Sequence, residues 1–275
     1  MKTTVKVNNR LTMLSEISND STFQILEYEN LSGVSSVEST ISINRLQECG
    51  VTLKQIRVVL DDSAVKLQSG VLNFMKGNIS IKSNIDTAPK FTRMIFKNNN
   101  VDESMIKPIL KGNGEIFLEP SIEYFTLLEL EDDEIVIDDS IFYACEEDVQ
   151  IYKVIKKIYN EAEEEVLQLR LKGNGIVVLK IPVPEEEILR YKLYKEKLIV
   201  NGDLVVLKYG NVNFSIEKSG NTLIGSVIGD EDEISVYSGI GEVWLLPTKS
   251  IYNNIDNLNR DEIYSDDFDY EEEDE

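Results

Sequence analysis

One short pattern occurs three times in this 275-residue chain: Gly-x-Gly, one further residue, two apolar residues and then Leu. The copies are Gly112–Pro120, Gly173–Leu179 and Gly239–Thr248. Their first glycines are 61 and 66 residues apart (112 to 173 and 173 to 239). A pattern that returns at a nearly constant interval predicts an array of similar structural units. Because units this small rarely bury a full core alone, they are expected to pack together as one body.

A second pattern also recurs: two apolar residues, a tight turn of Asp, Asn or Gly, and then an alternating stretch. Its copies are Val59–Leu67, Val136–Ala144 and Ile199–Leu207, with turns 77 and 63 residues apart (61 to 138 and 138 to 201). Asp, Asn and Gly accept the positive φ that tight turns need. The two interleaved patterns predict about three similar tandem β units.

Short runs rich in β-branched residues make up most of the chain, with Gly, Asn or Asp between them. Runs of this kind, spaced by about eight to twelve residues, predict an all-β sandwich or barrel. The predicted strands include Thr22–Tyr28, Ser39–Asn44, Gln55–Leu60, Phe125–Leu130 and Ile176–Ile181. The predicted turns include Asp61–Ser63 and the acidic runs Glu131–Glu134 and Asp230–Glu233.

One stretch has helical spacing instead. Between Val154 and Leu167, apolar residues fall three or four apart beside Lys and Glu, at Ile155, Ile158, Ala162 and Val166. This spacing predicts a short surface helix over Val154–Leu167.

The net charge of −22 is unevenly distributed. Residues 256–275 contain eleven acidic residues and one basic residue, a net of −10, which leaves −12 for residues 1–255. We expect a partly ordered N-terminal segment at 1–30, a repeated β body at 31–254 and an acidic disordered tail at 255–275. The units of the body are expected near 31–110, 111–171 and 172–254. A body this acidic disfavours nucleic-acid partners.

The composition also limits the chemistry. The chain has no histidine, which excludes Ser-His-Asp and Cys-His catalysis and nearly all zinc, iron or copper sites. Its two cysteines, Cys49 and Cys145, have no metal-site spacing and favour a reducing, cytoplasmic location. No apolar run has the length of a signal peptide or a membrane span. Carboxylate-based chemistry and calcium binding remain open.

No residue is predicted to be catalytic, cofactor-binding or metal-binding, and no cofactor is expected. The Gly-x-Gly segments run directly into strands without the third Gly or the Lys of phosphate-binding loops, so we interpret them as turn or bulge glycines. Trp244 aligns with Phe117 and Val178 in the other copies, which favours a core position over ligand stacking. The acidic runs lack the Asp-x-Asp-x-Asp-Gly pattern of calcium loops and are interpreted as solvated hairpin tips.

With these segments identified, the chain resembles the altered-inheritance-of-mitochondria family, whose bacterial and mitochondrial members are β proteins similar to the tryptophan attenuator protein. Six segments carry the resemblance: Gly70–Asn78, Gly112–Pro120, Phe142–Cys145, Gly173–Leu179, Val212–Lys218 and Gly239–Thr248. The resemblance implies a double-stranded β-helix or jelly-roll-like sandwich, repeated within the chain, that assembles as a ring or trimer. It implies no catalytic activity and no cofactor. The acidic turn between Ser226 and Ser235 departs from the Gly-rich turn expected of the family.

The leading hypothesis is therefore a non-enzymatic, oligomeric β-sandwich protein that binds or scaffolds other proteins, with self-association through free sheet edges. Two alternatives stay open. The first is a carbohydrate-binding module or a hydrolase that uses carboxylates in a groove. The second is a nucleic-acid binder, which would need a localised stripe of Lys and Arg to overcome the net charge.

Overall fold

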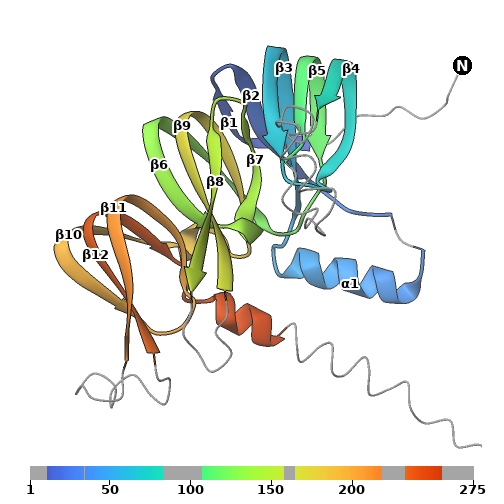
Figure 1. The fold of residues 1–275 in the computed structure, drawn as a ribbon. Helices are drawn as coiled ribbons and strands as arrows, with labels where there is room; N and C mark the ends of the chain where they lie inside the picture. Colours follow the sequence, from blue (N-terminus) through green and yellow to red (C-terminus); the bar gives the residue numbers. More distant parts are fainter. Residues whose placement is uncertain (1–10, 34, 83–106, 158–164, 219–232, 256–275) are drawn as a thin grey trace, which may run out of the picture. The chain divides into compact units, whose positions relative to one another are not determined.

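The structure is a computed structural model that describes residues 11–33, 35–82, 107–157, 165–218 and 233–255. The chain divides into two compact units, Met1–Ile181 and Pro182–Glu275. Antiparallel strands dominate both units, which confirms the predicted all-β fold class (Figure 1). No helix in these ranges is long and apolar enough to cross a membrane.

The described part of the first unit contains nine strands, one α-helix and one short 3-10 helix. In chain order they are β1 (Leu11–Ser18), β2 (Ser21–Tyr28), α1 (Val37–Glu48), β3 (Leu53–Leu67), β4 (Leu72–Lys82), β5 (Ile109–Leu118), β6 (Tyr124–Asp138), η2 (Asp139–Ile141), β7 (Phe142–Glu146), β8 (Gln150–Lys157) and β9 (Glu165–Ile181).

Two long strands, β3 and β9, organise the sheet of the first unit. Strand β3 pairs with β5 on one side and with β2 and then β7 on the other, since Val65 pairs with both Leu110 of β5 and Glu146 of β7. Strand β9 pairs with β6 over its length and also with β7 and β8. The outer strands β1 and β4 pair with β2 and β5, respectively. Alternate side chains of these strands, such as Phe23, Ile56, Val58, Ile116 and Val178, form one buried apolar cluster.

The second unit is a smaller antiparallel sheet. Its elements are η3 (Glu185–Glu187), β10 (Leu189–Val200), β11 (Val205–Lys218) and β12 (Glu233–Leu245), followed by helical residues at 249–255. Within this unit β12 pairs with β11 on one side and with β10 on the other. A separate apolar cluster on one face includes Leu193, Tyr237, Val243 and Leu245.

Several predicted turns lie inside continuous strands. Asp61–Ser63 lies within β3, and Glu131–Glu134, predicted to be a hairpin tip, lies within β6. At both places the register shifts against the partner strand, between Leu60 and Ser63 and between Glu131 and Asp133. Asp and Gly mark β-bulges as well as turns, and here the flanking cross-strand pairs keep the strand continuous. The turn predicted within Ile199–Leu207 is observed, because residues 201–203 connect β10 to β11.

The strand predicted at Ser39–Asn44 is wrong, because these residues lie in α1. Ser36 caps the helix, with its Oγ accepting a hydrogen bond from the Ser39 backbone N–H at 3.1 Å. Such a cap contributes about 1 kcal/mol, which offsets much of the few tenths of a kcal/mol that each of the four β-branched residues of α1 costs in a helix. None of the side chains of α1 is buried, so local capping rather than core packing accounts for the helix.

The helix predicted at Val154–Leu167 is also wrong in the residues that the structure describes. Residues 154–157 belong to β8 and residues 165–167 to β9, and Val154 pairs with Gln168. The described apolar residues that are spaced three or four apart therefore lie on two neighbouring strands and not on one helix. Cross-strand pairing overrides a weak local helical preference. Residues 158–164 lie outside the described ranges, as do 230–232 of the acidic run Asp230–Glu233.

The three Gly-x-Gly segments occupy the same kind of position. Each lies within a strand, β5, β9 or β12, opposite a bulge in the neighbouring strand. Each bulge contains one non-glycine residue with positive φ: Asp62 (φ 49°), Asp132 (φ 57°) and Lys195 (φ 71°). At each bulge a backbone N–H donates to the side chain two residues later, from Asp61 to Ser63, Glu131 to Asp133 and Tyr194 to Glu196.

Candidate functional site

A hollow of about 300 Å³ lies in the first unit, where four segments meet: the turn between β1 and β2, the bulge of β3, the start of β5, and the turn between β7 and β8. Its lining residues are mostly acidic. They are Asp20, Asp61, Asp62, Ser63, Ala64, Lys111, Glu147 and Asp148. Five carboxylates against one lysine make this a negatively charged concavity.

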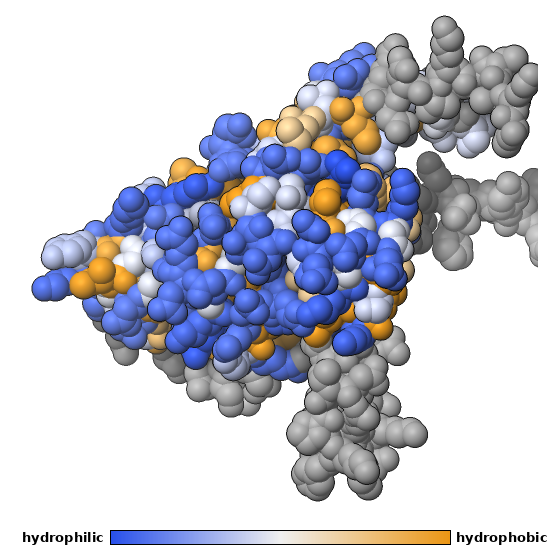
Figure 2. Space-filling view, turned by 90° about the horizontal axis from the view of Figure 1, so that it is seen from above, coloured by the Kyte–Doolittle hydropathy of each residue, from blue (hydrophilic) through white to orange (hydrophobic). Residues whose placement is uncertain are grey.

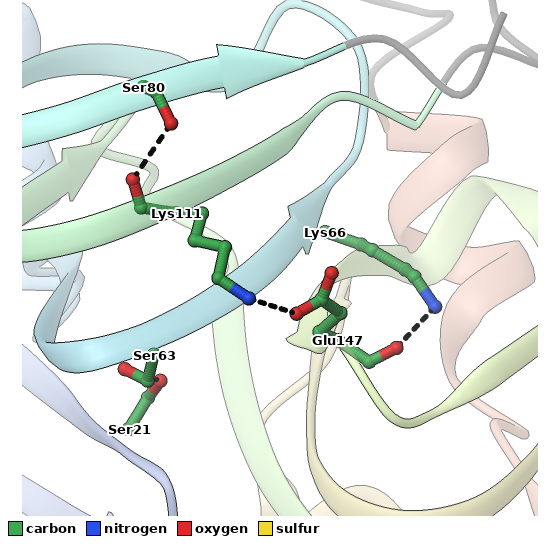
Figure 3. A network of polar contacts seen from close by, with 6 residues as sticks. All are labelled: Ser21, Ser63, Lys66, Ser80, Lys111 and Glu147. Carbon is green, nitrogen blue, oxygen red and sulfur yellow. Dashed lines mark hydrogen bonds and ion pairs between the residues drawn. The ribbon is translucent and has the colours of Figure 1, made fainter. Parts of the chain in front are cut away.

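Lysines hold one wall of the hollow in place (Figure 3). Lys111 Nζ lies 3.3 Å from Glu147 Oε2, and Lys66 Nζ donates to the backbone oxygens of Glu147 and Val149 at 2.6 and 2.7 Å. Ser80 Oγ donates to the backbone oxygen of Lys111 at 3.1 Å, which joins β4 to the same network. The turn after β7 is thus tied to both β3 and β5.

A buried carboxylate, Glu146, supports the hollow from the side of the core. Its Oε1 accepts from the Ser21 backbone N–H at 2.7 Å, and its Oε2 accepts from Asn19 Nδ2 and the Ile176 backbone N–H at 3.0 and 2.9 Å. Both oxygens are therefore occupied, and Glu146 is a structural group rather than a general base. Beside it the hydroxyls of Ser21 and Ser63 lie 2.8 Å apart and are buried.

The bulge of β3 places the other acidic side chains. Asp62 adopts a left-handed conformation, and its backbone N–H donates to Asn113 Oδ1 of the Gly-Asn-Gly segment at 2.8 Å. The same contact recurs between Asp132 and Asn174 at 2.7 Å. The middle residue of the first two Gly-x-Gly segments is therefore an Asn because its side chain satisfies a bulge amide that the ladder leaves unpaired.

The hollow can accept hydrogen bonds and attract cations, but its acids do not form a preassembled metal site. In the described ranges, no group of three or more Cys, Asp or Glu side chains is placed to hold a metal ion. The lining contains no aromatic side chain on which a sugar ring could stack. The arrangement supports binding through hydrogen bonds to hydroxyl or ammonium groups.

Three buried titratable groups of the first unit are held in their uncharged or paired forms. Burial raises the pKa of the Cys145 thiol to about 12, so the thiol stays protonated at neutral pH and is a poor nucleophile. Burial also raises the pKa of Tyr143, whose hydroxyl donates to the Glu119 backbone oxygen at 2.7 Å. Burial lowers the pKa of Lys107, and Asp139 opposes the shift from 3.1 Å.

The Gly-x-Gly segments leave no space for a phosphate. A Cβ on Gly112 would lie 2.0 Å from the Asn78 backbone oxygen, and one on Gly239 would lie 2.2 Å from that of Asn211. These glycines allow neighbouring backbones to approach closely, and the bulges lie in the opposing strands. The interpretation as turn or bulge glycines is therefore wrong in detail, because the glycines lie within continuous strands and the bulges lie in the neighbouring strands.

Trp244 is a buried residue, as predicted. It is 5% exposed, its Nε1 donates to Glu242 Oε1 at 2.7 Å, and the Arg190 guanidinium lies 4.2 Å from its ring centroid. Both the indole N–H and the ring of Trp244 therefore have partners within the second unit. Of the acidic run Asp230–Glu233, only Glu233 is described, as the first residue of β12.

Sequence reasoning missed the residues that line the hollow. Asp20, Lys111, Glu147 and Asp148 come from three separate turns and strands and share no spacing along the chain. Only Asp61 and Asp62 gave a signal, and that signal was interpreted as a turn. Their association depends on how β3 pairs with β5 and β7.

Comparison with known proteins finds a family and solved structures that are similar to most of this chain. The family described as mitochondrial biogenesis AIM24 matches residues 47–248. Protein SPYM3_0169 from Streptococcus pyogenes, known from its crystal structure, is similar in fold, with a TM-score of 0.53 and 17% identity over 76% of this chain and 94% of that one. No curated protein matches the chain. Since the family match covers most of the chain, including all three Gly-x-Gly segments, the protein belongs to the mitochondrial biogenesis AIM24 family.

Proposed function

We propose that the protein acts by contact with other protein chains, including further copies of itself, and catalyses no reaction. The observation that carries this proposal is the exposed edge of β4. Among the described residues β4 pairs only with β5, and nearly all of its side chains are exposed. An edge strand with a row of unpaired backbone groups is a template for pairing with another chain.

The composition of β4 favours a protein partner. Phe74, Met75 and Ile81 are 49%, 38% and 54% exposed, and Phe74 stacks on Phe117 of β5 with ring centroids 4.5 Å apart. The strand carries Lys76 and Lys82 and no acidic residue, in a chain of net charge −22. An acidic surface, such as that of a second copy, is therefore complementary to this edge.

The character of the surface fits contact through strands rather than through one large apolar patch. Figure 2 shows a mostly hydrophilic face with apolar residues in small separate groups. Main-chain pairing at a sheet edge supplies affinity without a large apolar area, while a few side chains supply specificity. A homo-oligomer built this way would place the exposed apolar side chains of β4 in an interface.

The absence of catalysis is supported by composition and by the use of the buried groups. The chain contains no histidine, the Cys145 thiol is fully buried, and both carboxylate oxygens of Glu146 accept hydrogen bonds. A reducing, cytoplasmic location is part of the same proposal and is supported by two free cysteines.

We also propose that the fold is a jelly-roll-like sandwich of three tandem units. Support comes from the recurrence of one local arrangement: a Gly-x-Gly strand opposite a bulge with a left-handed residue, at Asp62, Asp132 and Lys195. The division of the chain into three such units stays a prediction. Superposition of the three bulge-and-glycine segments in an experimental structure would test it, and unrelated backbone paths would reject it.

The test of self-association is light scattering of the full chain at micromolar concentrations. We expect a mass above that of a monomer, and an Ile81→Lys variant is expected to shift the mass toward the monomer because it places a charge on the β4 edge. Ile122→Lys is the matched control, since Ile122 has a similar exposure of 48% and lies outside β4. A strictly monomeric wild type, or equal effects of both variants, would reject the proposal.

The acidic hollow supports a second candidate function, the binding of a polyhydroxylated ligand such as a carbohydrate. Its five carboxylates provide hydrogen-bond acceptors around a volume of about 300 Å³. A panel of oligosaccharides assayed by calorimetry tests this function. Binding that is lost in Asp62→Asn would support it, and no heat with any sugar would dismiss it.

A further inference from the structure

One strand of the second unit, β10, is basic in an otherwise acidic chain. Strand β10 carries four basic residues and one acidic residue, a net of +3, within a protein of net charge −22. We define the basic face as Arg190, Lys192, Tyr194, Lys195 and Lys197 of β10 with Ile240 of β12. The cross-strand register places these side chains together, because Tyr194 pairs with Ile240 and Lys197 with Ser238.

The basic face is accessible and partly apolar. Tyr194 is 72% exposed and Ile240 is 50% exposed, the largest exposures among the apolar side chains of this sheet. In the described ranges β10 pairs only with β12, so its other edge is open. Arg190 forms an ion pair with Glu185 at 2.6 Å and Lys197 forms one with Glu217 at 3.3 Å. Glu242 of β12 pairs opposite Lys192 in the ladder. Lys192 and Lys195 form no ion pair with another described residue, so their charges are the ones left for a partner. The one acid of the strand, Glu196, is engaged by the Tyr194 backbone N–H at 2.9 Å.

The same structural position is acidic in the first unit. The bulges opposite the first two Gly-x-Gly segments consist of Asp61–Ser63 and Glu131–Asp133, and the corresponding bulge in β10 is Tyr194–Glu196 with Lys195 as its left-handed residue. The backbone geometry therefore does not require a lysine at this point. The third bulge therefore differs from the other two in charge, with a tyrosine and a lysine at its first two positions, and not in backbone conformation.

A segment of complementary charge follows, in sequence, residues that contact Glu187 just before β10. Residues 256–275 have a net charge of −10 and contain Tyr264, Phe268 and Tyr270 among the acids. The helical residues that precede them, 249–255, are tied to η3, because Tyr252 donates to Glu187 Oε1 at 2.8 Å and Thr248 donates to the same carboxylate. Glu187 lies two residues before the start of β10 at Leu189.

We propose that the acidic segment 256–275 binds in cis across the basic face of its own chain and covers Tyr194 and Ile240. Twenty residues can span up to about 70 Å when extended, and the twelve residues of β10 extend over about 40 Å, so the segment can reach along the whole strand. A short tether raises the effective concentration to the millimolar range, so individually weak surface ion pairs suffice.

Carbodiimide cross-linking of the full-length chain tests the proposal, since the reagent joins carboxylates to amines that are in contact. Isotopically heavy and light chains are mixed so that links within one chain can be distinguished from links between chains by mass spectrometry. We expect links from residues 256–275 to Lys192, Lys195 and Lys197, within one chain, at several times the yield at the exposed Lys153 of β8. Salt should reduce them, because the Debye length falls from about 10 Å at 0.1 M to about 3 Å at 1 M.

Two matched variants separate charge from mere proximity. In Lys192→Glu/Lys195→Glu, links to the remaining Lys197 should fall severalfold, because two attractive charges become repulsive. In Lys192→Arg/Lys195→Arg, links to Lys197 should persist, because the charges remain. Links that are spread evenly over exposed lysines, links that form only between chains, or equal Lys197 yields in both variants would overturn the proposal. The proposal does not rest on self-association through β4, and light scattering reports on that property separately.

Discussion

The close approach of backbones at the third Gly-x-Gly segment gives a prediction whose two components can be separated. Gly239 has φ +133°, and a Cβ there would lie 2.2 Å from the Asn211 backbone oxygen. Gly241 has no such φ, but a Cβ would lie 2.1 Å from the Tyr209 backbone oxygen. Gly202, in the turn between β10 and β11, has φ +73° and no atom within 4 Å of its Cβ position. Alanine at Gly239 therefore introduces both backbone strain and a steric clash. Alanine at Gly241 introduces the clash alone, and alanine at Gly202 introduces the strain alone.

The expected losses of unfolding free energy follow from these geometries. Gly202→Ala should cost about 1 kcal/mol, the conformational strain of a left-handed alanine partly offset by a less flexible unfolded chain. Gly241→Ala should cost about 2–3 kcal/mol, because the β11–β12 backbones must move apart by roughly 1 Å and a ladder hydrogen bond weakens. Gly239→Ala combines both effects and should cost about 3–5 kcal/mol.

Urea unfolding followed by tryptophan fluorescence measures these losses where they arise. Trp244 is the single tryptophan and lies on β12 with Gly239 and Gly241, 5% exposed. The reasoning predicts the order Gly202→Ala, Gly241→Ala, Gly239→Ala in increasing loss. A Gly239→Ala variant within 0.5 kcal/mol of wild type, about the spread of ordinary surface substitutions, would refute it. So would a Gly202→Ala variant that loses as much as Gly239→Ala.

Three further predictions concern buried groups and charge. Glu146→Gln should lower the unfolding free energy by about 2–4 kcal/mol, because an amide NH₂ replaces an oxygen that accepts from backbone or Asn19 N–H donors. Urea unfolding monitored by circular dichroism measures this loss, and an unchanged midpoint would contradict the structural role of Glu146. Because the folded pKa of Cys145, about 12, exceeds its ordinary value of 9.0, the thiol contributes stability that is fully present below pH 9 and lost as the pH rises towards 12. The unfolding free energy should fall with pH by up to about 1.4 kcal/mol per pH unit in this range, and the fall should be shallower by that amount in Cys145→Ala; equal slopes would be the contrary result. A single-stranded oligonucleotide should show no mobility shift even at low salt, because the net charge of −22 outweighs the +3 of β10; a shift that Lys192→Glu/Lys195→Glu abolishes would show the opposite.

The strand content of the fold was predictable from sequence, but strand length was not. Phe125–Leu130 and Glu134–Asp138 are separate runs in sequence and one strand, β6, in the structure. The acids between them occupy a bulge whose amide is satisfied by Asn174, a residue some forty positions away. A local pattern marks where a strand departs from regular geometry. Whether the chain turns there or continues is decided by the partner strand.

The two exchanged assignments have a common physical cause. The α1 residues are rich in Ile, Thr and Ser and look like a strand, and the end of β8 with the start of β9 looks like an amphipathic helix. Propensity differences amount to only a few tenths of a kcal/mol per residue. Such small differences are offset by an N-cap at Ser36 in the first case and by eight cross-strand pairs in the second. Neither the cap nor the pairing partner is visible within the stretch itself.

The acidic hollow and the basic face show which parts of a site a single sequence can reveal. The hollow brings together Asp20, Asp62 and Glu147 through strand pairing, so no spacing along the chain could have located it. The basic face is a run of neighbours on β10, and its four basic residues could be counted from the sequence. Their meaning depends on the structural equivalence of Lys195 with Asp62 and Asp132, which share a left-handed bulge but no sequence identity. Since the bulge geometry tolerates acids twice, its sequence in β10 is free to serve recognition, and the oppositely charged segment tethered at Glu187 is the ligand that the chain itself places within reach.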